Sequence, residues 1–339
     1  MSAVVVCSVR NEGAFLLEWV IWYRMLGFSG IVVVTNDCTD RSCALLAQLA
    51  RAGWVEHLDC ALPAGKSGIT LAKLRAASEL LTLRRAESVL VCDVDEFLVI
   101  HRGDGLIGDL LAAPGRGYLG LSVNWRVFGS GGLLHYADQP VHQQFRVAIS
   151  SQSGRNRWVK SICRHPRWFQ RLREHGPTGL DLDKARRETG VDWGQEPLIW
   201  VNPTGRLIES WTPDGPYLQS VGPNDIDHSV AQMNHYMLRS AETFSLKAGT
   251  LSPVAGKDRY TRTYWATADG RDDYDDSADR YAPHFAALHR EAMGLPGVAR
   301  QHYLCCADHV AAIALKAGQT PGDDPRLARF LGLAEAWSA

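Results

Sequence analysis

The first part of the chain, to about residue 125, alternates short apolar runs with longer segments of helical character. β-Branched residues dominate the short runs, as in the strands of a buried parallel sheet. The predicted strands cover residues 3–9, 31–35, 54–58 and 89–92, and the predicted helices cover residues 12–26, 40–52 and 70–86. Gly27 and Gly53 follow two of these helices, where a left-handed residue commonly ends a helix, and Thr70 is expected to cap the third. This order predicts an α/β fold with a mostly parallel central sheet flanked by helices.

The pattern is less regular from residue 118 onward. Residues 118–123 and 141–149 are predicted to be strands, and residues 129–132 form a glycine-rich turn. Residues 281–339 have helical spacing of apolar positions, and prolines divide them into three short helices. None of these helices is stable alone in water, so they are expected to pack on the rest of the chain or on a partner chain in a possible homodimer.

Three polar segments directly follow predicted strands. They are Arg10-Asn11-Glu12, residues 36–40, and Asp93-Val94-Asp95. Each alone is explained as a cap or a turn. Because open parallel sheets bind ligands at the carboxyl ends of their strands, the three together predict one binding site at that edge.

Asp93 and Asp95 are the strongest chemical signal in the chain. Two carboxylates separated by one residue at the end of a buried strand offer oxygen ligands to a hard divalent cation. Such a cation neutralises a diphosphate and makes it a better leaving group. The pattern therefore predicts a site for Mn²⁺ or Mg²⁺, the alternative being a cluster of helix-capping residues.

Charge and length exclude several classes of protein. The 339 residues include 36 Lys and Arg against 37 Asp and Glu, so the formal net charge is −1. A chain so balanced has no overall field for nucleic acid or an anionic membrane, and no nucleic-acid partner is expected. No apolar run approaches the ~18 residues of a spanning helix, and the N-terminus lacks a basic leader region. A cytoplasmic protein without a transmembrane segment is expected.

The eight cysteines do not follow a disulfide or metal-binding pattern. None lies in a CxxC pair, and several fall within apolar runs. Buried thiols in a reducing compartment explain them best, and the spacing typical of zinc sites is lacking.

The N-terminal three quarters of the chain resemble a glycosyltransferase of the GT-A fold, within the broad family-2 group and close to its family-92-like branch. The resemblance covers residues 1–250 in order. It includes the Asn11-Glu12, Glu18-Trp19, Leu26-Gly27-Phe28, Asn36 to Asp40, Asp93 to Leu98, Asn124 to Ser130, Lys160-Ser161-Ile162, His175-Gly176-Pro177, Asn234-His235-Tyr236 and Arg239 to Phe244 segments and Lys247. It implies a catalytic unit at residues 1–250, followed at residues 251–339 by a linker and a helical extension packed on that unit.

The resemblance also implies roles for individual residues. Asp37 is expected to hold the base or ribose of the nucleotide, and residues 129–132 to face the donor sugar and the acceptor. The residues expected to bind the donor are Arg10, Asn11, Glu12, Asp37, Asp93, Gly129, Ser130, Lys160 and Lys247, and those expected to bind the metal are Asp93, Asp95 and His235.

The catalytic base is not identified by the sequence. An inverting enzyme of this fold needs a base soon after the glycine-rich turn to deprotonate the acceptor hydroxyl. The segment from Val141 to Phe145 contains no acid, which leaves Asp138, His142 and Glu174 as candidates. Inverting transfer is slightly favoured, and the stereochemical outcome stays open.

Two charged runs have simple explanations. The basic run at residues 155–173 is expected to be a solvated face, or else to meet an anionic acceptor such as a lipid-linked phosphate, with Lys160 on the donor phosphates. The acidic run at residues 269–279 lacks the glycine and glutamate of a Ca²⁺ loop and is expected to be a solvated connection.

The sequence therefore favours a metal-dependent glycosyltransferase that uses a nucleotide-sugar donor, with a UDP-sugar expected, and a saccharide or lipid-linked glycan acceptor. Polysaccharide biosynthesis is a fitting process for such an enzyme. Two alternatives stay open: a nucleotidyltransferase, although the Gly- and Arg/Lys-rich loop after strand one is lacking, and a catalytically degenerate saccharide-binding protein.

Overall fold

The main sheet of the protein combines a parallel half with a half in which antiparallel strands are inserted. A computed structural model describes residues 2–61, 68–115, 117–189, 198–250 and 258–337, and within them the main sheet has nine strands in the order β3-β2-β1-β4-β8-β6-β12-β5, with β11 paired to β6. The strands are β1 (Ala3–Val9), β2 (Gly30–Thr35), β3 (Glu56–Asp59), β4 (Ser88–Val91), β5 (Glu96–Ile100), β6 (Gly120–Val127), β8 (Val159–Arg164), β11 (Trp200–Val201) and β12 (Ala231–His235). β1, β2, β3 and β4 pair in parallel, whereas β8 and β5 run antiparallel to their neighbours.

Helices cover both faces of the sheet, and residues of β1 alternate between the two layers. Val5, Cys7 and Val9 join one apolar core, and Val4 and Val6 join the other. The helices are α1 (Gly13–Met25), α2 (Ser42–Arg51), α3 (Ile69–Ser78), α4 (Leu81–Arg84), α5 (Ile107–Ala112), α6 (Val141–Gln144), α7 (Leu182–Thr189), α8 (Ala241–Lys247), α9 (Arg262–Ala268), α10 (Ala282–Met293), α11 (Val298–Lys316) and α12 (Pro325–Ala336). The predicted α/β fold with a central sheet flanked by helices is confirmed.

The α1 helix is buried on nearly all sides, which explains its apolar composition. Trp19 and Trp22 are both fully buried, and the Trp22 indole donates a hydrogen bond of 2.9 Å to the Leu98 carbonyl in β5. A helix that is apolar all round needs cover on both sides. The sheet covers one side of α1, and α10 and α11 pack on it from the C-terminal segment.

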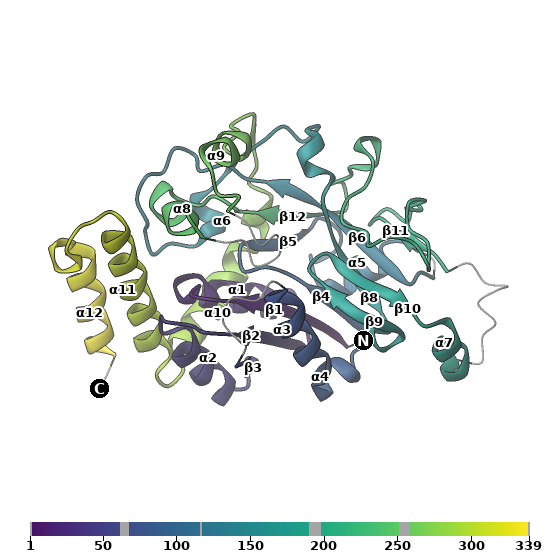
Figure 1. Cartoon of the computed structure of the whole chain (residues 1–339), viewed down its shortest axis with the longest axis horizontal. Helices are drawn as coiled ribbons and strands as arrows, with labels where there is room; N and C mark the ends of the chain where they lie inside the picture. The colour runs from purple at the N-terminus through teal and green to yellow at the C-terminus, as the bar shows by residue number, and fades with distance from the viewer. Residues whose placement is uncertain (1, 62–67, 116, 190–197, 251–257, 338–339) are drawn as a thin grey trace.

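The C-terminal segment forms helices, as its spacing predicts. In Figure 1 α11 and α12 lie side by side at one end of the molecule, and α11 also packs on α2 and α8. The division of the chain at residue 250 and the possible homodimer stay predictions. No helix among the described residues is both long and apolar enough to cross a membrane.

Three local predictions are wrong, and the strand β5 is missed. The predicted helix at residues 70–86 is two helices, because Leu80 is extended (ψ 140°) and brings Leu83 into the core. Thr70 is not the cap, since α3 begins after the left-handed Gly68 (φ 80°). The predicted strand at residues 141–149 contains the helical turn α6 and only a short strand, β7 (Val147–Ala148). The strand β5 was not predicted, because its residues directly follow the acidic motif.

Three shorter strands complete the described architecture. β9 (Phe169–Arg173) and β10 (Gly176–Leu180) form a hairpin, and β7 pairs with β13 (Asp273–Tyr274).

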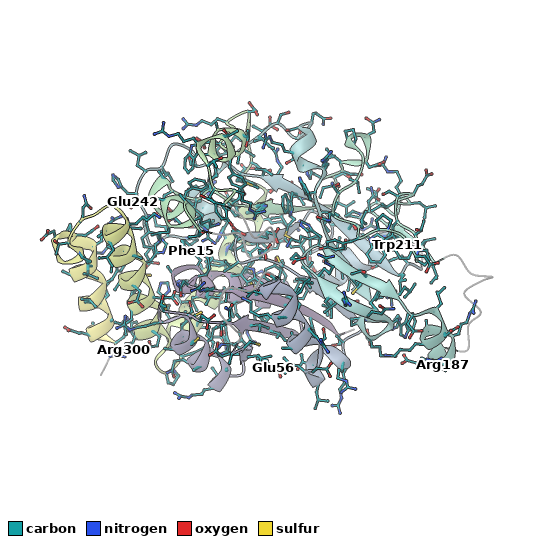
Figure 2. The ribbon with its side chains drawn as sticks, viewed as in Figure 1. Phe15, Glu56, Arg187, Trp211, Glu242 and Arg300 are labelled. Carbon is teal, nitrogen blue, oxygen red and sulfur yellow. The ribbon has the colours of Figure 1, made fainter. Side chains whose placement is uncertain are left out.

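His309 of α11 is enclosed where the C-terminal helices meet α1. Its ring packs edge-on against Phe15, labelled in Figure 2, with centroids 5.2 Å apart, and against Tyr136 at 4.6 Å. Its Nε2 lies 3.1 Å from the Thr243 hydroxyl. Burial, together with Arg239 and Arg326, lowers the pKa of His309 to about 3.

This histidine should make the protein less stable in acid. The unfolded chain takes up a proton at this residue near pH 6.5, before the folded chain does, so the free energy of unfolding falls as pH decreases from about 6.5 towards 3. Between pH 7.5 and pH 5, His309→Gln should lose about 2 kcal/mol less unfolding free energy than the wild type does. Urea denaturation at both pH values measures this difference. The matched control His284→Gln changes an exposed residue and should behave as wild type; equal acid sensitivity of both variants would contradict the assignment.

Candidate active site

The loops after β1, β2 and β4 meet at one edge of the sheet, as predicted. The side chain of Asn11 joins the first two loops. Its Nδ2 donates a hydrogen bond of 2.9 Å to the Thr39 hydroxyl, and its Oδ1 accepts one of 2.7 Å from the Thr39 backbone N–H. Asn11 has a left-handed backbone (φ 57°), which asparagine tolerates better than most residues. The Arg10 guanidinium donates to the Asp37 carbonyl at 3.3 Å.

Asp37 is exposed in the middle of this edge. Its backbone is also left-handed (φ 46°), and its Oδ2 accepts a hydrogen bond of 3.0 Å from the Asn36 amide. A carboxylate held this way keeps acceptor capacity for a ligand, because each oxygen offers more than one lone pair.

Arg239 links the loops after β1 and β4 to the segment that follows β12. This side chain is buried and pairs with Glu12 at 2.8 Å, while its other terminal nitrogen donates to the Val94 carbonyl at 3.2 Å. Its guanidinium lies 3.6 Å from the centre of the Phe15 ring. Glu12, expected to contact the donor, is therefore one anchor of the site in this structure. Arg239 was named only as part of a motif, and its position after Asn-His-Tyr is the signal for it.

Asp95 is mostly buried and contacts two residues from later in the chain, His235 in β12 and Lys247 in α8. Its Oδ2 accepts a hydrogen bond of 3.0 Å from the Lys247 ammonium, and its Oδ1 lies 3.5 Å from Nε2 of His235 at the end of β12. Burial alone would raise the pKa of Asp95, but Lys247 and His235 outweigh it and hold the pKa well below its usual value. The carboxylate is thus charged at neutral pH.

Asp93 is more exposed than Asp95 and belongs to a second group. Its Oδ2 lies 2.9 Å from Lys160 Nζ, which also lies 2.9 Å from Glu96 Oε2 and donates to the Glu174 carbonyl at 2.7 Å. Lys160 and Glu96 are both fully buried. Burial raises the pKa of Glu96, whereas Lys160 remains charged because Asp93 and Glu96 overcome its burial and raise its pKa. Lys160 therefore holds protein groups instead of facing solvent.

The remaining donor atoms have the chemistry that a divalent cation requires, although those of Asp93, Asp95 and His235 do not all lie within 4.8 Å of one another in this structure. Each lysine contacts the Oδ2 of its aspartate. The Oδ1 of Asp95 faces His235 Nε2, and no hydrogen bond or ion pair to the described residues is found at the Oδ1 of Asp93. Two carboxylate oxygens and one imidazole nitrogen are ligands that Mn²⁺ accepts, and Mg²⁺ accepts the oxygens. The two lysines also neutralise these carboxylates, so a cation at this position would share them with the ammonium groups.

The glycine-rich turn is covered by the acidic run. The Ser130 hydroxyl and backbone both donate to Asp269 at 2.7 Å, and a side chain at Gly129 would meet the Gly270 carbonyl. Farther along the run, the buried Arg126 pairs with Asp273 at 3.0 Å.

The expectation that residues 269–279 form a solvated connection is therefore wrong. Asp275 also pairs with Arg126, at 3.1 Å, and Asp279 contacts Arg146 at 2.7 Å. Several of these aspartates are counter-ions for Arg126 in β6 and for Arg146 after it, a role that spacing within the run does not reveal.

The three candidate bases lie in different surroundings. His142 is fully buried between the Trp22 and Phe285 rings, and its Nδ1 lies 2.7 Å from Glu18. Asp138 lies 3.1 Å from His302 Nε2 in α11. Glu174 is bonded through its carbonyl to Lys160, and its carboxylate accepts a 3.5 Å hydrogen bond from Tyr217.

Tyr217, the hydrogen-bond partner of Glu174, also lines a pocket of about 270 Å³. Trp158 forms another part of its wall, and Trp125 packs between Trp158 and His235, with centroid distances of 5.8 and 4.2 Å. Aromatic faces therefore connect this pocket to the histidine beside Asp95. Trp125 belongs to the Asn124 to Ser130 segment of the resemblance and Trp158 to the basic run, but the sequence assigns neither of them a role in a pocket.

No protein-family model matches the chain, and no curated protein sequence matches it. Solved structures similar to it include glucosyl-3-phosphoglycerate synthase from Mycobacterium tuberculosis with Mn²⁺, UDP and phosphoglyceric acid (13% identity over 60% of this chain and 68% of that chain, TM-score 0.30). S. aureus TarS 1–349 has 10% identity over 99% of this chain and 91% of its own, with a TM-score of 0.34. A putative glucose-1-phosphate thymidylyltransferase from Bacillus anthracis has 8% identity over 57% of this chain and 77% of its own, with a TM-score of 0.27. Similarity this low assigns no function.

Removing Lys160 should destabilise the protein strongly. Lys160→Met leaves Glu96 buried without its cation, which should cost about 3–5 kcal/mol of unfolding free energy. The double variant Lys160→Met/Glu96→Gln should recover a large part of that loss, because the penalty comes from the unpaired charge. Chemical denaturation of the wild type, Lys160→Met, Glu96→Gln and the double variant measures both effects. Lys247→Met is the matched control and should cost less, since that ammonium is partly exposed; a double variant no more stable than Lys160→Met would contradict the argument.

Proposed function

We propose that this protein is a metal-dependent glycosyltransferase of the GT-A fold that moves a sugar from a nucleotide-sugar donor to a hydroxyl of a glycan or glycolipid acceptor. The observation that carries the proposal is the approach of Asp95 and His235 to 3.5 Å beside Asp93, at the edge where the loops after β1, β2 and β4 meet. The ordered sequence motifs of residues 1–250, which supply these same side chains, support the same class of enzyme.

Asp93, Asp95 and His235 are the proposed ligands of Mn²⁺ or Mg²⁺. The cation would neutralise the diphosphate of the donor as it becomes the leaving group. Lys247 and Lys160 pair with the two carboxylates and hold them at this edge of the sheet before the donor binds.

A UDP-sugar is the proposed donor. Asp37, exposed at the end of β2, would accept a hydrogen bond from the base or ribose, and Arg10 lies next to it for the phosphates. The hydrogen bonds of Asn11 to Thr39 fix the loop that carries these groups.

Glu174 is the proposed base. Its carboxylate reaches Tyr217 in the wall of the pocket, whereas His142 is enclosed by aromatic rings and Asp138 faces α11. In this scheme the acceptor hydroxyl lies in the pocket and passes its proton to Glu174 as its oxygen attacks the anomeric carbon, and the nucleoside diphosphate leaves.

The competing functions are separated by one assay. The protein is incubated with Mn²⁺ and a panel of nucleotide sugars, and the products are identified. Metal-dependent release of nucleoside diphosphate supports a glycosyltransferase. Release of pyrophosphate during incubation with nucleoside triphosphates and sugar phosphates would indicate a nucleotidyltransferase, and binding without turnover would indicate a saccharide-binding protein.

Substitution of Asp95 should abolish most turnover. Asp95→Asn removes a charged ligand but keeps the shape of a side chain that is mostly buried, so the fold should persist. Release of nucleoside diphosphate should fall at least about 100-fold, because a Lewis acid supplies several kcal/mol of transition-state stabilisation.

The control for this variant is chelation of the wild-type protein. EDTA should reduce turnover to the same level, and Mn²⁺ should restore it in wild type but not in Asp95→Asn. If exhaustive chelation has no effect while Lys247→Met is inactive, the ammonium groups and not a metal neutralise the diphosphate.

Asp37 should contribute to nucleotide affinity. Asp37→Ala should weaken UDP binding by about 1.5–3 kcal/mol, the range for a hydrogen bond to a charged group. Calorimetric titration with UDP and Mn²⁺ measures this change, with Asp59→Ala, an exposed acid at the end of the edge strand β3, as the matched control. An unchanged Kd for Asp37→Ala would return this residue to a purely structural role in its loop.

A further inference from the structure

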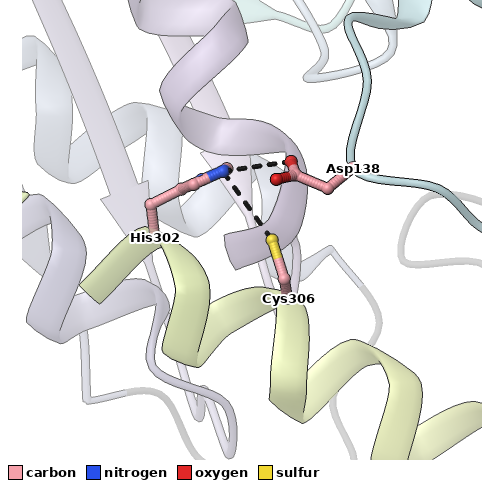
Figure 3. A group of neighbouring side chains, drawn as sticks. All are labelled: Asp138, His302 and Cys306. Carbon is pink, nitrogen blue, oxygen red and sulfur yellow. Dashed lines mark hydrogen bonds and ion pairs between the residues drawn. The ribbon is translucent and has the colours of Figure 1, made fainter. Parts of the chain in front are cut away.

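A second group of metal-ligand side chains lies on α11 and is not part of the proposed donor site. His302 and Cys306 are one helical turn apart, so they share one face of the helix, and Asp138 approaches them from the loop before α6, as Figure 3 shows. Among the described residues this is the group of three such side chains whose donor atoms all lie within 4.8 Å of one another.

The distances within the group match those expected around a bound ion. His302 Nε2 lies 3.1 Å from Asp138 Oδ1 and 3.8 Å from Cys306 Sγ. Tetrahedral zinc with ordinary bond lengths places an imidazole nitrogen about 3.3 Å from a carboxylate oxygen and about 3.6 Å from a thiolate sulfur. The two distances from His302 therefore differ from these values by only a few tenths of an ångström, and the Asp138 oxygen and the Cys306 sulfur lie within 4.8 Å of each other.

One nitrogen of His302 serves two neighbours in this group. Asp138 and Cys306 both face the same nitrogen of His302, and that nitrogen carries at most one hydrogen. A catalytic relay would instead use the two ring nitrogens separately. His302 Nδ1 is buried and has no hydrogen-bond partner among the described residues.

We propose that Asp138, His302 and Cys306 bind a zinc ion. Thiolate, imidazole and carboxylate together are a typical zinc ligand set, and three protein ligands leave a fourth position for water. Cys306 and His302 are buried, while about a quarter of the Asp138 side chain is exposed and gives the ion a path of entry. The spacing of cysteines does not predict this site, because its ligands are one cysteine, a histidine one helical turn away and an aspartate distant in the sequence.

The bound zinc would attach the segment between β6 and α6 to the C-terminal helices. Residues 131–139 are exposed except for Tyr136, so few apolar contacts hold them. A metal–ligand bond at Asp138 would fix this segment, which directly follows the glycine-rich turn, against α11. Asp138 would then be a metal ligand and not the base.

Metal analysis of the full-length protein, purified without chelators and with the thiols reduced, tests the proposal. About one zinc ion per chain is expected, retained after dialysis. Cys306→Ser should lose nearly all of it, whereas Cys305→Ser, a change at the equally buried neighbouring cysteine outside the group, should keep it. Replacement of zinc by Co²⁺ should produce a thiolate charge-transfer band in the wild type and in Cys305→Ser only.

Two further variants keep the test decisive. Asp138→Asn changes a partly exposed residue and should weaken zinc binding at least about tenfold even if Cys306→Ser fails to fold. Asp95→Asn should retain the zinc, which distinguishes this site from the donor site. Wild-type protein that takes up no zinc at equilibrium, or equal zinc content in Asp138→Asn and wild type, would overturn the proposal.

Discussion

The buried ammonium of Lys160 organises the centre of the molecule. Burying a lysine is costly unless its charge is matched by well-placed acceptors, and here Asp93, Glu96 and the Glu174 carbonyl supply three. These acceptors come from the turn after β4, from the start of β5 and from the loop between β9 and β10. The position of the acidic motif therefore depends on β8, which carries Lys160 and pairs with β4.

Much of the parallel half of the fold is predictable from the sequence because its strands are buried on both faces. The β-branched runs at β1 and β2 are distinctive, and Gly27 and Gly53 adopt the left-handed backbone (φ 83° and 71°) expected after their helices. The convergence of the loops after β1, β2 and β4 follows from parallel pairing alone. Local pattern and overall topology agree in this half, so each strengthens the inference from the other.

The second half is less predictable because its structure depends on partners distant in sequence. The sequence of the acidic run is typical of a solvated loop, whereas in the structure Arg126 and Arg146 pair with its aspartates. The segment after Pro140 is apolar enough to suggest a strand, yet Glu18 accepts hydrogen bonds from the Val141 and His142 backbone and starts a helical turn instead. These contacts cannot be predicted from local spacing, since they join residues more than a hundred positions apart.

The C-terminal helices support the edge of the sheet where the loops after β1, β2 and β4 meet, and are not merely a cover for α1. Cys305 packs so closely on Gly13 that a side chain there would lie 2.7 Å from its sulfur, and the Gly13 backbone donates to Asp40 at 3.0 Å. Asp308, one turn farther along α11, accepts a hydrogen bond of 2.9 Å from the backbone of Arg41. The loops after β1 and β2 are thereby held from behind by α11, at the points where the polypeptide turns away from Asn11 and Asp37. Because a binding loop must be fixed before its ligand arrives to bind without a large entropic cost, residues near position 305 belong to the physical basis of a site formed by residues near position 11.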